Sequence, residues 1–139
     1  MYEKLVQKAR EVRGFTPAAA EGAYVSRLLI DQDTVGSTRL VLNHFLLRPG
    51  HSTSPGSHPD PYDEAYYVLR GHGIVRLGAE AQAESFELEP DTVVFIPAGT
   101  VHALENTGAA DLELVTVMPC QPVEGVNPIY DERRRAWKS

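Results

Sequence analysis

The residues best suited to chemistry in this chain are two histidines and one glutamate, which lie in two separate stretches. His102 follows a tight turn containing Pro97 and Gly99, and such a turn would direct its imidazole from the start of a strand. His58 and Glu64 lie upstream, next to a strand-like run. Two histidines and one carboxylate make up the facial triad, which holds a divalent metal and leaves positions open for substrate or oxygen. The residue types therefore predict a metal site.

The spacing around Glu64 indicates how these donors could share one face. In the run that Glu64 begins, strand alternation places Glu64, Tyr66 and Val68 on the same side. A carboxylate at the head of an apolar face needs a counter-charge, which a metal would supply; the alternative is a glutamate in solvent at the strand end. His58 lies six residues earlier. The prolines at 59 and 61 favour an extended approach, which would keep His58 on the face of Glu64.

Both stretches resemble the two signature motifs of the cupin family. The second motif is matched by Pro97, Gly99, His102 and Asn106, with Asp91 in place of its first glycine. Two linked motifs are more specific than either alone, and the resemblance covers residues 23 to 119.

The first motif is matched by His58, Glu64 and Gly71, with Ser52 in place of its leading glycine and Asp60 in place of its second histidine. As a fourth ligand, Asp60 would make the site harder and more anionic, favouring iron, manganese or magnesium over thiolate-preferring metals. The alternative is a solvated turn aspartate beside prolines. The resemblance thus implies one divalent metal ion (iron, manganese, zinc or nickel) held by His58, Glu64 and His102, with Asp60 as a possible further ligand.

Four other residues are candidates for the cavity. His51 competes with Asp60 for the vacant motif position, although a solvent-facing loop histidine is the simpler interpretation. His44 shares a strand face with leucines and could act as a general base only if that face lines the cavity. Tyr66 is a candidate for substrate binding, whereas we expect Asn106 to cap the turn after its strand.

Short β-rich runs separated by turn residues fill the centre of the chain, which is typical of an all-β sandwich or barrel. The resemblance implies a cupin jelly-roll β-barrel, or double-stranded β-helix. Eight strands are expected, over residues 24–30, 38–47, 64–69, 73–77, 84–88, 92–96, 101–105 and 111–118.

Length and tails suggest a simple organisation. A chain of 139 residues predicts a single cupin domain over 1–139, with a barrel core over about 23–119 and short terminal extensions over 1–22 and 120–139. Residues 2–12 have roughly helical apolar spacing, although an extended segment laid on a neighbouring subunit would use the same residues. Residues 131–138 could form one or two helical turns. The simpler interpretation of this segment is a surface tail pinned by Trp137; the alternative is an active-site lid.

Composition narrows the functional classes. A formal charge of −6 argues against nucleic-acid binding. No apolar run has the length of a membrane span or signal peptide, and the single cysteine, Cys120, cannot form an internal disulfide, so a cytoplasmic location is expected. Strand stretches that are apolar on both faces predict a homodimer.

The function expected from the resemblance is a metal-dependent enzyme, of the dioxygenase, isomerase or cyclase type. Its substrate would be a small oxygen-bearing molecule that coordinates the metal in the barrel. The alternative is a non-catalytic cupin that binds or senses a small molecule, because fold and metal site do not decide between these classes.

Overall fold

Eight strands form the body of the protein in the computed structural model, which describes residues 1–120 and 124–138. Every strand expected from the sequence is present, with ends shifted by no more than two residues. The strands are β1 Tyr24–Ile30, β2 Leu40–Leu47, β3 Glu64–Arg70, β4 Gly73–Leu77, β5 Glu84–Leu88, β6 Val93–Ile96, β7 His102–Glu105 and β8 Leu112–Pro119.

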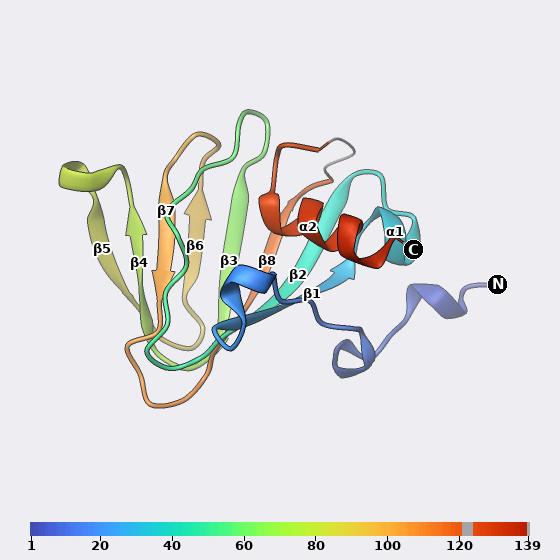
Figure 1. Cartoon of the computed structure of the whole chain (residues 1–139), viewed down its shortest axis with the longest axis horizontal. Coiled ribbons are helices and arrows are strands. Elements are labelled where there is room, and N and C mark those ends of the chain that lie inside the picture. The colour runs from blue at the N-terminus through green and yellow to red at the C-terminus, as the bar shows by residue number, and fades with distance from the viewer. Residues whose placement is uncertain (121–123, 139) are drawn as a thin grey trace.

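The strands pair into two antiparallel sheets that face each other as a jelly roll. One sheet has the order β1-β2-β8-β3-β6 and the other the order β5-β4-β7 (Figure 1). The turn between β3 and β4 requires Gly71, whose φ is 88° and where a Cβ would collide with the Asp111 carbonyl oxygen. The first-motif glycine thus serves the strand connection rather than the site.

Strand alternation divides the larger sheet into a buried and a more exposed face. On β3, Glu64, Tyr66 and Val68 are buried whereas Tyr67 and Leu69 are exposed, as the sequence predicts. The buried face contributes to two apolar clusters, one centred on residues such as Phe45 and Leu114 and a second that includes Met118. Side chains from these clusters surround the space in which the site lies.

The N-terminal region forms short 3-10 turns: η1 Glu3–Leu5, η2 Ala9–Glu11 and η3 Ala18–Ala20. A further turn, η4 Glu80–Gln82, joins β4 to β5. The single helix expected over residues 2–12 is not formed. No residue of η1 or η2 is buried, so the apolar spacing there has no surface within the chain to pack against.

Two α-helices flank the larger sheet. The short α1 (Gln32–Val35) follows β1 and begins with a capping box, in which the Asp31 carboxylate accepts from the Thr34 N–H. The C-terminal α2 (Pro128–Trp137) starts with Asn127 as N-cap and a proline in its first turn. No helix in residues 1–120 and 124–138 is long and apolar enough to cross a membrane.

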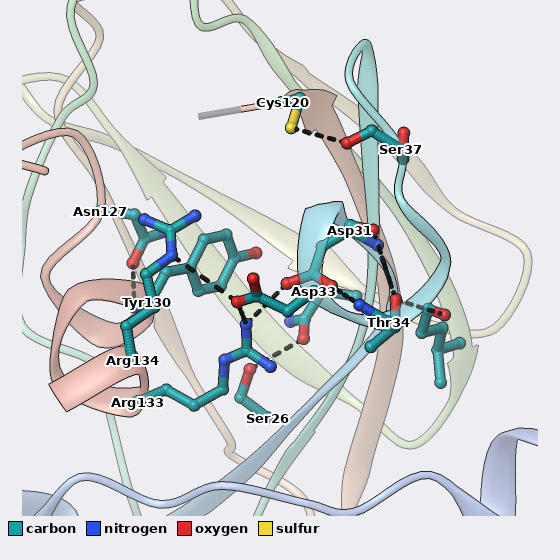
Figure 2. A network of polar contacts seen from close by, with 12 residues as sticks. Ser26, Asp31, Asp33, Thr34, Ser37, Cys120, Asn127, Tyr130, Arg133 and Arg134 are labelled. Carbon is teal, nitrogen blue, oxygen red and sulfur yellow. Dashed lines mark hydrogen bonds and ion pairs between the residues drawn. The ribbon is translucent and has the colours of Figure 1, made fainter. Parts of the chain in front are cut away.

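Helix α2 is fixed to the barrel by a buried ion pair. Arg133 Nη2 lies 2.6 Å from Asp31 Oδ2 and 3.1 Å from Asp33 Oδ2 (Figure 2). Trp137 packs edge-on against Phe15 and lies under the Arg13 guanidinium. The C-terminal segment is therefore more than a surface tail pinned by Trp137, because its Arg133 is buried against the start of α1.

Candidate metal centre

His102 begins β7 and is oriented by the turn before it. Gly99 has a φ of 83°, a left-handed conformation that glycine adopts without strain, and Thr100 follows it. The His102 Nδ1 lies 2.9 Å from the Thr100 carbonyl oxygen. A carbonyl oxygen can only accept, so Nδ1 carries the proton and Nε2 is left with its lone pair on the other side of the ring.

His58 is brought beside His102 by the loop that carries it. Gly56 pairs with His102 through two backbone hydrogen bonds, and the Gly99 N–H donates to the His58 carbonyl oxygen at 2.6 Å. These contacts join the two motifs. The His58 Nδ1 lies 2.9 Å from the Val126 carbonyl oxygen, so this imidazole too directs Nε2 inward.

Glu64 completes the group from the start of β3, where it pairs with Ile96 of β6. Its Oε1 lies 3.3 Å from His102 Nε2 and 3.5 Å from His58 Nε2. Burial by itself would raise the pKa of the Glu64 carboxyl. In the metal-free protein, the His102 and His58 rings can each carry a second proton on Nε2 and donate it to the carboxylate, which outweighs burial and lowers the pKa. The hydrogen bond to Glu64 raises the pKa of His58 despite the opposing effect of burial.

These three residues, called the triad below, have the donor set and geometry of a metal site. One ligand atom from each lies within 4.8 Å of the others. Both imidazoles have Nδ1 held by a backbone carbonyl, which fixes the ring and leaves Nε2 for a metal. Two neutral nitrogens and one carboxylate oxygen fit a divalent ion such as iron, manganese, zinc or nickel.

The remaining candidates are not brought to the triad. Asp60 is exposed, because it lies in a turn closed by the Tyr62 N–H on the Pro59 carbonyl oxygen. His51 lines the cavity but is exposed. His44 points to the opposite face of β2, where its Nε2 lies 3.1 Å from Glu113 Oε1.

The other two candidates, Tyr66 and Asn106, differ in their roles. Tyr66 is buried on the face of Glu64 and lines the cavity, and its ring lies edge-on to His102. Asn106 is buried as a turn cap, donating to the Leu47 and Ala110 carbonyl oxygens and accepting from the Gly108 N–H. Asn106 thus stabilises the turn after β7, as expected.

The triad lines a cavity of about 580 Å³. Its described lining combines an apolar part, including Tyr24, Phe45 and Leu114, with a polar part that includes Ser26 and Thr116. Among the described residues, the lining includes no lysine or arginine, and Glu64 is its sole carboxylate. A ligand here would meet aromatic and neutral polar groups beside the triad.

Sequence reasoning missed several residues of this cavity. Thr116 was detectable, since it interrupts the apolar alternation of its strand with a polar residue on the buried face, whereas the two faces of β2 are too similar to show which way Asn43 points. Tyr130 of α2 is fully buried and lines the cavity, and burial raises the pKa of its hydroxyl. Neither Tyr130 nor the Val126 carbonyl carried a sequence signal, because both reach the site through the docking of α2.

Comparisons with known proteins agree with this geometry. The chain is 32% identical over 98 residues to the tetracenomycin polyketide synthase protein TcmJ of Streptomyces glaucescens, an alignment covering 70% of this chain and 62% of that protein. The chain thus spans less than two thirds of that relative. It is 27% identical over 90 residues to an oxalate-binding protein of Thermotoga maritima, covering 65% of this chain and 70% of that protein.

The structure of the polyketide cyclase RemF from Streptomyces resistomycificus superposes with a TM-score of 0.69 at 24% identity, covering 94% of this chain and 92% of that chain. At this identity the likeness concerns the fold. The Cupin_2 family, described as the cupin domain, matches residues 43–118, which contain both motifs and the whole triad. On this match, and with eight strands in a jelly roll, the chain belongs to the cupin family.

Proposed function

We propose that this protein is a metal-dependent enzyme that binds one divalent ion at the triad and acts, as a cyclase does, on an oxygen-bearing substrate of polyketide type. The observation that carries the proposal is the pair of imidazoles whose Nδ1 atoms face the Thr100 and Val126 carbonyl oxygens. Both rings therefore direct a lone pair towards the Glu64 carboxylate, in a cavity large enough for a multi-ring ligand.

The triad would hold the ion, and the ion when bound would supply Lewis-acid polarisation of a substrate oxygen. The residues around it would orient the substrate. Burial raises the pKa of Tyr130, and its hydroxyl can donate a hydrogen bond to a substrate oxygen. Burial and the neighbouring Glu64 carboxylate raise the pKa of Tyr66, so this hydroxyl keeps its proton beside the triad. Phe45 and Leu114 give the substrate an apolar surface and exclude water from that side.

Two similar proteins that act in polyketide chemistry support the choice of substrate. TcmJ is a polyketide synthase protein and RemF is a polyketide cyclase. Dioxygenase and isomerase chemistry would use the same triad, and the identity of the product distinguishes these reactions from cyclisation.

A second candidate is a cupin that binds a small molecule without converting it. Outside the triad, His51 is the sole further histidine among the described lining residues, and it is exposed. A cavity with few groups to move protons suits a binding protein, and one relative is an oxalate-binding protein.

Metal analysis tests the triad directly. Protein purified without chelator should contain about one divalent ion per chain, and His102→Ala and Glu64→Ala should each lose it. His51→Ala and Asp60→Ala are matched controls that remove a nearby histidine or carboxylate outside the triad, so both should retain the ion. Absence of metal from the wild-type protein after reconstitution with iron, manganese, zinc and nickel would refute the proposal.

Turnover distinguishes the enzyme from the binding protein. The metal-loaded protein, incubated with linear aromatic polyketide mimics, should yield cyclised products by mass spectrometry and NMR, whereas the Glu64→Ala protein should not. Oxygen uptake with the same compounds would indicate a dioxygenase instead. Saturable binding with neither product nor oxygen uptake would favour the non-catalytic alternative.

A further inference from the structure

A row of polar side chains crosses the otherwise apolar inner face of the larger sheet. Asn43 of β2 is the direct partner of Thr116 of β8, which in turn is the partner of Tyr66 of β3. All three side chains are buried and line the cavity. Ser26 of β1 extends the row, because its Oγ donates to Asn43 Oδ1 at 2.8 Å.

The neighbouring rows show that these polar residues are not needed to complete the sheet. On one side Phe45 faces Leu114, and on the other Val41 faces Met118. Apolar side chains thus fill the equivalent positions on both sides. The Asn43–Thr116 pair thus lies between the two apolar clusters.

Asn43 is a member of this row whose amide has one hydrogen bond and one free donor group among the described residues. Its side chain is only 4% exposed, and its Oδ1 is engaged by Ser26. No hydrogen bond joins its Nδ2 to any residue in the described ranges, 1–120 and 124–138. Since Asn43 lines the cavity, the cavity is where a partner for this group would lie.

The charge of the lining indicates the kind of partner. Away from the triad, where Asn43 lies, the described lining residues include no lysine or arginine to balance the charge of an anion. An amide N–H₂ group donates well to a neutral carbonyl or phenolic oxygen. Tyr24 and Phe45, whose ring centroids are 4.8 Å apart, offer a flat apolar surface nearby.

We propose that Asn43, held by Ser26, is a second oxygen-binding point of the cavity and selects neutral, flat ligands with two or more keto or phenolic oxygens over small carboxylates. The inference rests on the proposed function, in that one ligand oxygen lies at the triad while another accepts from Asn43. Ser26 acts as a positioning residue, since its hydroxyl fixes which way the amide faces.

The test uses the metal-loaded protein and two probes, 1,8-dihydroxyanthraquinone as the neutral ligand and oxalate as the anion, with affinities from calorimetry. The wild type should bind the anthraquinone at least ten-fold more tightly than oxalate. Asn43→Leu should weaken anthraquinone binding roughly ten-fold, as expected for one lost hydrogen bond in a buried site, and leave the metal content unchanged. His44→Gln is the matched control, because this neighbour on β2 points to the opposite face.

Ser26→Ala provides a milder variant should Asn43→Leu fail to fold, and it should weaken anthraquinone binding several-fold at unchanged metal content. The inference would be overturned if a folded variant bound the anthraquinone with unchanged affinity. It would also be overturned if the wild type preferred oxalate or did not bind the anthraquinone. Failure of the proposed function can be told apart from failure of this inference. A protein that binds no metal would refute the metal site at the triad. The ratio of anthraquinone affinities of wild type and Asn43→Leu, measured in that metal-free protein, would still decide the role of Asn43.

Discussion

The ion pair between Arg133 and Asp31 should control both the stability of the protein and the geometry of the triad, and Arg133→Met tests this. The two side chains are 5% and 3% exposed, and their closest atoms are 2.6 Å apart. Methionine keeps much of the volume of the arginine stem but leaves the Asp31 carboxylate buried without its counter-charge.

The size of the effect follows from what remains around Asp31. Breaking a buried ion pair by removing one partner costs about 3–5 kcal/mol of unfolding free energy. Two observations favour the lower end of this range. The Thr34 N–H still donates to Asp31 Oδ1, and Arg133 Nε has no hydrogen-bond partner in the described structure, so the pair is incompletely satisfied at the outset. Asp33 is 56% exposed, and its contact with Arg133 adds little. We expect a loss of about 3 kcal/mol.

The effect on the triad passes through the segment that precedes α2. The Val126 carbonyl oxygen accepts from His58 Nδ1. Helix α2 begins at Pro128, two residues after Val126, and Arg133 fixes this helix to the barrel. Loss of such an orienting partner typically lowers metal affinity 10–100-fold. Folded Arg133→Met protein should therefore bind zinc or manganese about ten-fold more weakly in a competition titration.

Urea unfolding of chelator-treated protein measures the stability, and Arg135→Met is the matched control because Arg135 is an exposed arginine of the same helix. The control should change the unfolding free energy by about 0.5 kcal/mol or less. Asp31→Asn combined with Arg133→Met should cost less than the sum of the single changes, since the uncompensated charge is gone. Equal stabilities of Arg133→Met and Arg135→Met would refute the energetic reasoning, and unchanged metal affinity in folded Arg133→Met would refute the link to His58.

Two further predictions concern pH and assembly. In metal-free protein, the lowered pKa of Glu64 stabilises the fold at pH values above the pKa of the unfolded state, and this stability is lost as the pH falls through the pKa of the folded state. The raised pKa of His58 has the opposite effect: its contribution to stability is lost as the pH rises through the pKa of the folded state. Urea unfolding against pH should therefore show an acid limb that Glu64→Gln flattens and an alkaline limb that His58→Gln flattens; unchanged limbs would contradict the assignment. Val93 and Phe95 are 65% and 60% exposed on the outer face of β6, so we expect a homodimer that buries them. Sedimentation velocity should give twice the 15.3 kDa chain mass and Phe95→Glu should give a monomer, whereas a wild-type monomer would refute the prediction.

The sequence by itself predicted the strands, and it singled out the three residues that the structure brings together as the triad. Both depend on local features: turn residues end each strand, and strand alternation places Glu64 and Tyr66 on one face. Gly99 and His102 lie in one short segment, and the turn at Gly99 orients the His102 imidazole. The geometry of this turn depends only on residues close in sequence. Interactions between residues close in sequence need no knowledge of the rest of the fold.

The orientation of β2 could not be read from its sequence. Leucines on the face of His44 and apolar residues on the face of Asn43 make the two sides of this strand almost equally hydrophobic. Pairing with β8 decides that Asn43 points inward and His44 outward towards Glu113. A shift by one residue would exchange the two faces, and only the tertiary packing selects between them.

Tertiary structure also decided which groups surround the triad. Asp60 occupies a motif position, but the turn between Pro59 and Tyr62 places it in solvent. The Val126 carbonyl reaches His58 although 68 residues separate them in sequence, because α2 docks through Arg133 and Asp31, which are 102 residues apart. Such contacts depend on the balance of burial and charge over the whole fold, so no local pattern in the sequence contains them.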